Sequence, residues 1–328
     1  MSHSYVKLDN GNRMNMTLLY STFVLLIGFS AAASAQSYPS KPIRLLVGFT
    51  AGGSADAAAR PVANRMNQAL GTTIVIENRG GAGGSVAAQI VARAAPDGYT
   101  LLWSSPGALT ISQILEKNLP YNAQTAFAPI SLAFTFCNAL VARPDFQATS
   151  MGQLIALAKA KPGQLNYGSQ GVGSAGHLSG ALLQSMTGIS LTHVPYKGGN
   201  DILTALLGGE LQLSFASSTT ARAMRGRMKI LAVTSLNRDP SLPDVPSMNE
   251  AGVRGYDASF WFGLLAPAGT PSAIANRLNR HLREALTDSE LMSPLQEQGL
   301  NAAPSTPQEY AARIKADYEK WKKVIGGA

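Results

Sequence analysis

The chain has 328 residues, of which 45% are hydrophobic and 14% are charged, so its composition is that of a globular protein and excludes a disordered one. Its net charge of +8 comes from Lys and Arg residues that are scattered along the chain. Because no basic stripe with interleaved aromatic residues is present, we expect no nucleic-acid partner. The single cysteine, Cys137, excludes an intrachain disulfide framework and lies in an apolar run, so we interpret it as a small buried side chain rather than a nucleophile.

The N-terminus has the pattern of a secretory signal peptide. Lys7 and Arg13 precede an apolar run over residues 17–29, which is too short to span a bilayer comfortably. Small residues follow and offer a cleavage site after Ala35. We therefore expect residues 1–35 to be removed from an exported protein.

Strand-like and helix-like patterns then alternate along the chain. Several of the strand-like runs are continuously apolar, as buried parallel strands are. This βαβα order predicts an α/β fold with mostly parallel sheets flanked by helices. The expected strands are 43–49, 73–77, 100–104, 138–142, 164–168, 191–196, 211–216, 229–234 and 260–266, and the expected helices between them are 54–70, 84–95, 150–161, 175–187 and 199–208.

The C-terminal part is predicted to be helical. Thr270 precedes a proline and is expected to cap a helix that ends near Leu286. Thr306 and Glu309 have the spacing of a capping box at the start of the last helix. One feature opposes the helical pattern upstream: Pro61 falls inside the first expected helix, which should kink there or begin late.

The loop before the first helix has the features of an anion site. In the sequence VGFTAGGSADAAAR an apolar strand stops, two glycines follow, and a small-residue helix begins. A helix N-terminus leaves its first N–H groups unpaired and carries partial positive charge, so a small anion is favoured there. Asp56 lies in the first turn, where it either complements the helix dipole or contacts a ligand. The loop residues are Thr50, Ala51, Gly52, Gly53, Ser54 and Asp56.

A second strand–turn–helix unit lies about 120 residues further on, in the sequence YGSQGVGSAGHLSGALLQ. Gly171, Gly173 and Gly176 have the spacing of a dinucleotide-binding fingerprint, but the preceding strand is short and polar and no acidic residue follows at the required distance. We expect two such helix N-termini to face each other and to hold one carboxylate between them. His177 in the first helical turn either contacts that ligand or is structural.

Few residues have the pattern of a catalytic or metal site. The histidines lack metal-ligand spacing, and the chain has no G-x-S-x-G motif and no P-loop lysine. An enzyme would require Ser104 or Ser174 to lie near His177 as a nucleophile–base pair. We therefore expect a binding protein with no cofactor and no metal, rather than an enzyme.

Five segments together resemble one known family. FTAGGSADAAAR, VIENRGGAGGSVAAQIVARAAPDGYTLL, LNYGSQGVGSAGHL, LTHVPYKGG and WFGLLAPAGTP are similar to the Bug (Bordetella uptake gene) family, the periplasmic solute-binding proteins of tripartite tricarboxylate transporters. The resemblance extends from about Tyr38 to the C-terminus.

The resemblance implies a fold and a domain organisation. The fold would be a two-domain periplasmic-binding-protein clamshell of the Venus flytrap, type II-like kind. Its two crossover segments would lie near residues 136–140 and 258–262. The first domain would comprise residues 36–138 and 260–328, and the second domain residues 139–259.

The resemblance also implies a carboxylate ligand held between the domains by loop backbone and hydroxyl groups. Ala216 stands where the family often has an acidic residue, and this favours a plain mono- or dicarboxylate, aromatic or not, over an amino acid. The resemblance implies that the ligand is held by a set of loop residues: Thr50, Ala51, Gly52, Gly53, Ser54 and Asp56 of the first loop, Ser104 and Ser105, Ser169, Gly171, Gly173, Ser174 and His177 of the second loop, and Ser217 and Ser218 at the side.

The implied function is capture of a small organic carboxylate in the periplasm and its delivery to the large and small membrane subunits of a transporter. A ligand sensor that presents its closed form to a signalling partner is the alternative, and a periplasmic enzyme is a remote one. We expect the protein to be a monomer, because docking to the membrane subunits requires free domain faces.

Overall fold

The computed structural model describes residues 1–5, 38–196 and 198–326. The predicted signal peptide falls almost entirely on residues outside this range. Residues 41–328 form one compact unit, distinct from residues 1–40, and the fold below is that of the larger unit. No helix among the described residues is both long enough and apolar enough to cross a membrane.

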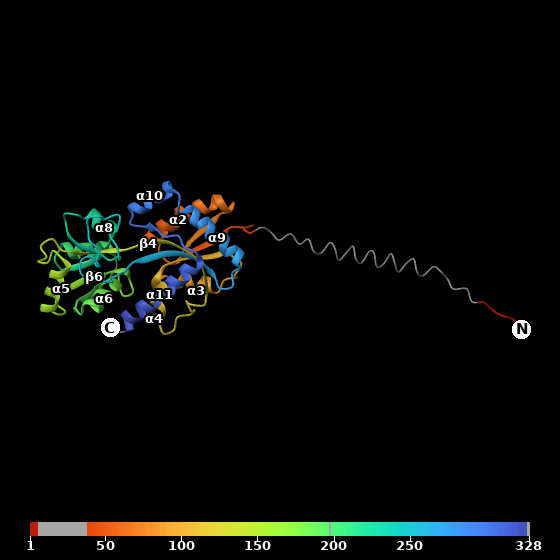
Figure 1. The fold of residues 1–328 in the computed structure, drawn as a ribbon, viewed down its shortest axis with the longest axis horizontal. Helices are drawn as coiled ribbons and strands as arrows, with labels where there is room; N and C mark the ends of the chain where they lie inside the picture. The colour runs from red at the N-terminus through yellow and green to blue at the C-terminus, as the bar shows by residue number, and fades with distance from the viewer. Residues whose placement is uncertain (6–37, 197, 327–328) are drawn as a thin grey trace. The chain divides into compact units, whose positions relative to one another are not determined.

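The strands of this unit form two sheets (Figure 1). The first has six strands in the order β11-β4-β10-β3-β1-β2 and the second has five in the order β7-β6-β8-β5-β9. The first sheet contains β1 (Ile43–Val47), β2 (Ile74–Asn78), β3 (Thr100–Ser104), β4 (Phe127–Phe136), β10 (Phe260–Pro267) and β11 (Asn301–Ala302). The second contains β5 (Asn138–Ala142), β6 (Asn166–Ser169), β7 (Thr192–Pro195), β8 (Leu213–Ser217) and β9 (Lys229–Val233).

Both sheets are mixed, which corrects the expectation of mostly parallel sheets. β1 is parallel to β2 and β3, and β6 is parallel to β7 and β8. These strands are joined by helical crossovers, which return the chain in the same direction. β10 is antiparallel to β3 and β4, and β5 is antiparallel to β8 and β9. The chain passes between the two sheets at antiparallel strands. It leaves the first sheet at β4 and enters the second at β5, with only Cys137 between them, and it returns from β9 to the first sheet at β10.

Helices cover both sheets (Figure 1). The first predicted helix is confirmed as one helix that continues through Pro61. Thr306 and Glu309 form the predicted capping box. Thr270 is not a cap, because its hydroxyl donates to the Pro267 carbonyl and the helix begins two residues later. The helices are α2 (Ser54–Leu70), α3 (Ser85–Ala92), α4 (Ser112–Leu115), α5 (Met151–Ala160), α6 (Ala175–Thr187), α7 (Gly199–Leu207), α8 (Ser218–Ala223), α9 (Ser272–Ala285), α10 (Ser289–Glu297) and α11 (Pro307–Gly326), with a short 3₁₀ helix at Ala82–Gly84 and a π-helix at Gly107–Ile111.

Helix α11 packs with the cores of both sheets. Tyr310 and Ile314 lie among core residues of the first sheet, whereas Trp321 and Val324 lie in the core that includes β5, β6 and β8. A single helix therefore ties the two cores together near the segment that leads from β9 to β10.

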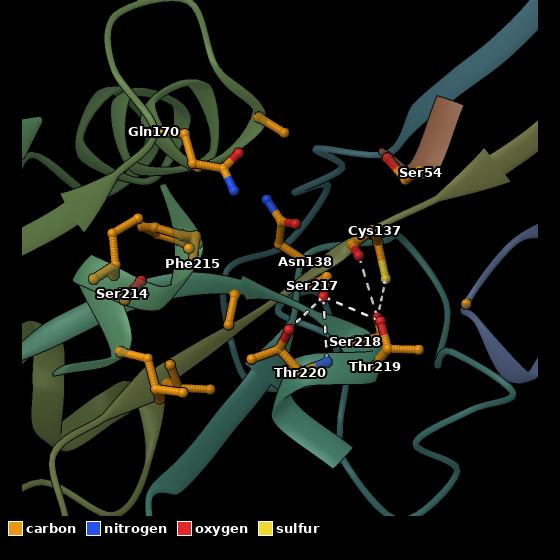
Figure 2. A pocket seen from close by; sticks show the side chains of 18 of the residues that line it. Ser54, Cys137, Asn138, Gln170, Ser214, Phe215, Ser217, Ser218, Thr219 and Thr220 are labelled. Atoms are coloured by element: carbon orange, nitrogen blue, oxygen red, sulfur yellow. Dashed lines mark hydrogen bonds between the residues drawn. The ribbon is translucent and has the colours of Figure 1, made fainter. Parts of the chain in front are cut away.

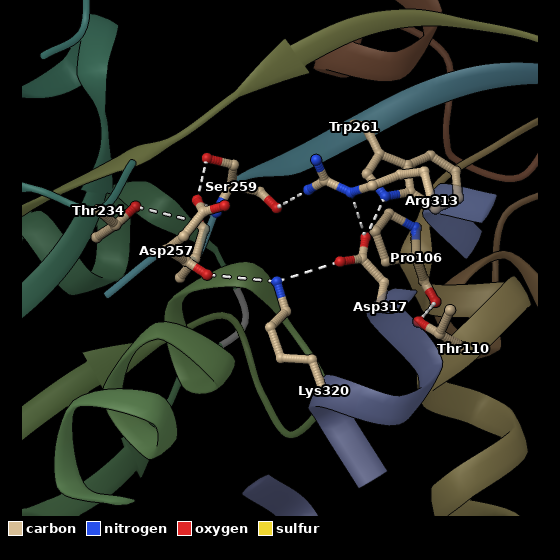
Figure 3. A network of polar contacts seen from close by, with 10 residues as sticks. Pro106, Thr110, Thr234, Asp257, Ser259, Trp261, Arg313, Asp317 and Lys320 are labelled. Atoms are coloured by element: carbon tan, nitrogen blue, oxygen red, sulfur yellow. Dashed lines mark hydrogen bonds and ion pairs between the residues drawn. The ribbon is translucent and has the colours of Figure 1, made fainter. Parts of the chain in front are cut away.

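A buried carboxylate fixes this helix against β10 (Figure 3). Asp317 is 3% exposed and accepts hydrogen bonds from Trp261 Nε1 at 2.6 Å and from Arg313 Nε at 3.0 Å. Lys320 Nζ lies 3.2 Å from the same carboxylate and also donates to the Asp257 carbonyl. Two cations and an indole N–H satisfy the buried charge, so the network is structural.

Candidate functional site

A pocket with a volume of about 330 Å³ lies at the carboxyl ends of strands β6 and β8 (Figure 2). Open α/β sheets place ligands at this end of their strands. The pocket is lined by Ser54 at the start of α2 and by Gln298, Gly299 and Leu300 after α10, together with residues of the second sheet. The remaining lining comes from the β4–β5 junction (Phe136, Cys137, Asn138, Val141), the loop after β6 and the start of α6 (Gln170, Ala175, Gly176), α7 (Gly199, Asn200, Ile202, Leu203, Leu206), β8 and α8 (Ser214, Phe215, Ala216, Ser217, Ser218, Thr219, Thr220), and Met228.

Three helices of eight residues or more begin at the pocket. They are α2 at Ser54, α6 at Ala175 and α7 at Gly199. The N-cap residues of α2 and α7 are the glycines Gly53 and Gly198, and neither helix has a side-chain cap. Their first-turn N–H groups and the positive ends of their dipoles are therefore available to a bound acceptor.

The described residues that line this pocket include no Lys, Arg, His, Asp or Glu. Any positive potential that they supply comes from helix N-termini, and their polar side chains are amides and hydroxyls. Such a lining suits a small anion whose charge is held by backbone N–H groups. It offers neither a nucleophile–base pair nor a metal site, and no group of three or more potential metal ligands occurs elsewhere among the described residues.

The first predicted loop brings only Ser54 to the pocket. Thr50, Ala51 and Gly52 are exposed beside it, and Gly53 is partly exposed. Asp56 is 3% exposed and faces its own loop: its carboxylate accepts from Gly52 N, Arg60 Nε and Asn78 Nδ2, each at 2.9 Å.

The Asp56 carboxylate is held in its charged form by these partners. Burial raises the pKa of Asp56, but the hydrogen bonds from Arg60, Gly52 and Asn78, together with the charge of Arg60, outweigh burial and lower it below its usual value. In this structure the Asp56 carboxylate braces the loop that precedes α2, and its contact with a ligand stays a prediction.

The second predicted loop is braced by neutral groups. Ser169 Oγ lies 2.6 Å from His193 Nε2 and 3.2 Å from Ser174 Oγ. Ser174 caps α6 by accepting from His177 N, and His177 Nδ1 accepts from Gly173 N. Ser174 also donates to the Gly171 carbonyl at 2.7 Å.

The two imidazoles of this loop lie against each other, with ring centroids 4.6 Å apart. Burial and the neighbouring His193 lower the pKa of His177 to about 4, and burial also lowers the pKa of His193. Both rings are therefore neutral at pH 7. None of Ser169, Gly171, Gly173, Ser174 and His177 lines the pocket, although Ala175 and Gly176 directly after them do.

The serines predicted at the other strand ends divide into two pairs. Ser104 and Ser105 are buried, do not line the pocket, and make hydrogen bonds within their own turn. Ser217 and Ser218 do line it (Figure 2). Ser217 caps α8 by accepting from Thr220 N, so only part of its hydroxyl capacity is free for a ligand.

Ser218 connects the pocket wall to the one cysteine. Its Oγ donates to Asp239 Oδ2 at 2.6 Å, and Cys137 Sγ donates to the same oxygen at 3.1 Å. Burial and the nearby Asp239 charge raise the pKa of the Cys137 thiol to about 12. A thiol with so high a pKa is a poor nucleophile, as the apolar run around it predicted.

Sequence reasoning missed three parts of the pocket. Gly199 and Asn200 open α7 after a Gly-rich turn, a third strand–turn–helix unit whose GGND sequence was a usable signal. Asn138 is an amide at the head of an otherwise apolar strand, NALVA. Gln298 to Leu300 follow α10, and their sequence carries no signal for a site.

Residues 58–327 match the family described as the tripartite tricarboxylate transporter family receptor. The chain is 35% identical over 318 residues to protein BugT of Bordetella pertussis, covering 95% of this chain and 98% of BugT. It is also similar to the solved structure of R. palustris Rpa4515 with adipate (34% identity, TM-score 0.77, covering 88% and 97% of the two chains). A third similar structure is the periplasmic binding protein BugD (34% identity, TM-score 0.74, covering 88% and 98%).

These similarities confirm the resemblance to the Bug family and the periplasmic-binding-protein fold class. The similar proteins are receptors and solute-binding proteins, which confirms that the chain is not an enzyme. The matched residues, 58–327, are most of this chain. The chain therefore belongs to the tripartite tricarboxylate transporter receptor family.

Proposed function

We propose that this protein is a periplasmic receptor that binds a small organic carboxylate in the pocket and delivers it to the membrane subunits of a tripartite tricarboxylate-type transporter. The observation that carries the proposal is the convergence of the α2, α6 and α7 N-termini on one pocket whose described lining has no charged side chain. A carboxylate is the small anion that both this arrangement and the adipate-bound relative favour.

Ligand capture would couple to closure of the two halves of the chain. We propose that residues 36–138 with 260–328 move as one domain and residues 139–259 as the other, with segments 136–140 and 258–262 as the hinge. Ser54 and the residues Gln298, Gly299 and Leu300 belong to the first part, and the rest of the pocket belongs to the hinge or the second part. A ligand that contacts both parts is bound more tightly by the closed state and so shifts the equilibrium toward it.

The first test uses the mature protein, produced without residues 1–35. Native mass spectrometry identifies any acid retained through purification, and thermal unfolding then screens mono-, di- and tricarboxylates. We expect at least one class to raise the melting temperature, since a ligand that binds only the folded state stabilises it. If no carboxylate is retained and none shifts the transition, the proposal is wrong. Light scattering in the same samples tests the expected monomer.

A charge substitution at the start of α7 localises the site. Gly199 does not adopt a positive φ, and a Cβ there would make only an ordinary contact with Gln170. Gly199→Asp should therefore fold, because an acidic residue suits a helix N-terminus, but it should abolish the carboxylate-induced shift by repulsion. Gly199→Asn has the same size without the charge and should keep most of the shift. Loss of binding in both variants, or in neither, would contradict the helix N-terminal site.

Delivery to a transporter is tested in cells. Deletion of the gene should abolish uptake of the radiolabelled acid identified above, and expression of the Gly199→Asn variant should restore it while Gly199→Asp should not. Uptake that continues without the protein would contradict the transport role.

A further inference from the structure

Asn138 carries a buried hydrogen-bond donor that the described residues leave without a partner. The residue is 6% exposed and lines the pocket, and its Nδ2 has no acceptor. Its backbone is satisfied: its N–H donates to Thr234 Oγ1 at 2.9 Å and its carbonyl accepts from Thr234 N at 2.8 Å. In Figure 2 the amide projects into the pocket, toward the side on which Gln170 lies. A buried unpaired donor is costly, so a ligand oxygen is the partner that this position fits.

The wall of the pocket changes along helix α7 from polar to apolar. Gly199 and Asn200 line the pocket at the start of the helix, and Ile202, Leu203 and Leu206 line it further along. We call the part of the pocket lined by Ile202, Leu203 and Leu206, with Val141 and Met228, the inner compartment. Val141, Ile202, Leu206 and Met228 are all core residues of the second sheet, so this part of the pocket borders that core.

Ser214, a polar residue beside the inner compartment, already has a hydrogen-bond partner. Ser214 is 2% exposed, and its hydroxyl donates to the Gly168 carbonyl. No described residue that lines the compartment has a cationic side chain. A second carboxylate placed there would lose its water without gaining a counter-charge, whereas an apolar group would gain by leaving water.

We propose that the pocket selects a monocarboxylate with an uncharged, apolar body, aromatic or aliphatic, over di- and tricarboxylates. The carboxylate accepts from the N-termini of α2, α6 and α7 and from Asn138 Nδ2, and the body occupies the inner compartment. This inference rests on the proposed function and narrows it, because it names the class of acid that the same site takes. It also distinguishes the chain from the relative whose structure contains adipate, a dicarboxylate.

The decisive experiment is isothermal titration calorimetry on mature protein that has been unfolded, dialysed and refolded to remove retained ligand. The probes are benzoate, hexanoate, adipate and citrate at matched ionic strength, with benzamide as the uncharged analogue of benzoate. We expect benzoate or hexanoate to bind at least ~10-fold tighter than adipate and citrate. Adipate or citrate binding as tightly as the monocarboxylates would overturn the inference but leave the proposed function standing. Binding of no carboxylate, or equal binding of benzamide and benzoate, would contradict the proposed function itself.

Asn138→Leu tests the orphaned donor with a side chain of similar size. Affinity for the preferred monocarboxylate should fall at least ~10-fold, as expected for a lost hydrogen bond to a charged group. The melting temperature without ligand should stay the same or rise, because the variant no longer buries an unpaired donor. A merely structural asparagine would give the opposite pattern, with lowered stability and unchanged affinity.

Leu203→Lys tests the inner compartment. Leu203 is partly exposed, so a lysine can be accommodated with its stem along the apolar wall. The added cation should lower the ratio of benzoate to adipate affinity at least ~10-fold, whereas the matched control Leu203→Met should keep the wild-type ratio. If the lysine variant does not fold, Met228→Lys makes the same test at another residue that lines the compartment. An unchanged ratio in a folded lysine variant would show that the ligand body does not occupy this compartment.

Discussion

The two glycine-rich loops look alike in sequence but are held in place by different chemistry. The loop before α2 is braced by one buried carboxylate, Asp56, which accepts three hydrogen bonds including one from Arg60. The loop before α6 is braced by uncharged hydroxyls and imidazoles, among them Ser169, Ser174 and His177. Both arrangements leave a helix N-terminus at the pocket.

The two loops show that loops of similar sequence can be held in place by different kinds of interaction. Each brace lies behind its loop, so neither the Asp56 charge nor the two imidazoles line the pocket. The lining of the pocket is therefore uncharged whichever way a loop is braced. Because the braces differ, the stability of the two loops should respond differently to mutation and to acid.

The largest effect is expected from Asp56→Ala, which leaves the Gly52 N–H, the Asn78 amide and Arg60 without their shared acceptor. Arg60 is half-exposed and recovers water, and Asn78 keeps its bond to the Phe49 carbonyl, so we expect a loss of about 1–2 kcal/mol. Urea unfolding at pH 7 measures it.

The matched control for that substitution is Arg44→Ala, which removes an exposed ion pair with Glu77 and should cost less than about 1 kcal/mol. An Asp56 variant as stable as the Arg44 variant would show that the carboxylate does not brace the loop.

Acid should act on the second loop first. Because the pKa of His177 is lowered to about 4 in the folded state, the unfolded chain binds a proton more readily below pH 6.5, and stability is lost as the pH falls from there toward 4. Between pH 7.5 and 5.0 we expect His177 to contribute a loss of about 1–2 kcal/mol. The lowered pKa of Asp56 acts only in stronger acid, because its stabilisation is lost as the pH falls through that lowered value.

The variant His177→Gln separates the loss of stability caused by His177 from the loss caused by Asp56. Urea unfolding of the variant should show a weaker dependence on pH between 7.5 and 5.0 than that of the wild type. If His177→Gln and the wild type showed the same pH dependence, His177 would not be the cause of the loss of stability in acid.

The smallest effect compares two helix caps. Ser174 caps α6 at the pocket and Ser150 caps α5 away from it, and each accepts one first-turn N–H at 3.3 Å. Replacing either by alanine should cost about 1 kcal/mol of unfolding free energy. Only Ser174→Ala should also weaken carboxylate binding, because Ala175 and Gly176 directly after it line the pocket. Equal ligand affinity in both variants would argue that the α6 N-terminus does not contact the ligand.

The sequence predicted the fold well where a local pattern determines it. Strands 100–104 and 138–142 and helix 175–187 have their predicted bounds, because an apolar run or a capped, glycine-terminated helix marks both ends. β4 was missed, since Pro129 interrupts its pattern and only Cys137 separates it from β5. Strand direction was wrong for β5 and β10, because periodicity shows that a segment is a strand but not which neighbour it will meet.

The site was harder to predict than the fold. Ser54, Ser217 and Ser218 line the pocket, and each lies in a turn of small residues after a strand, but their contact with a ligand stays a prediction. The other expected residues lie behind or beside the loops, and their role in binding stays a prediction. Asn138 was missed since its amide is exceptional only once its burial and lack of a partner are known.

The most direct test of the central claim is a crystal structure of the mature protein with the acid that binds it most tightly. The account predicts the carboxylate within hydrogen-bond distance of backbone N–H groups at the start of α6 or α7, close to Asn138 Nδ2, with no lysine or arginine side chain in contact. A carboxylate paired with a basic side chain, or bound outside the pocket, would contradict it.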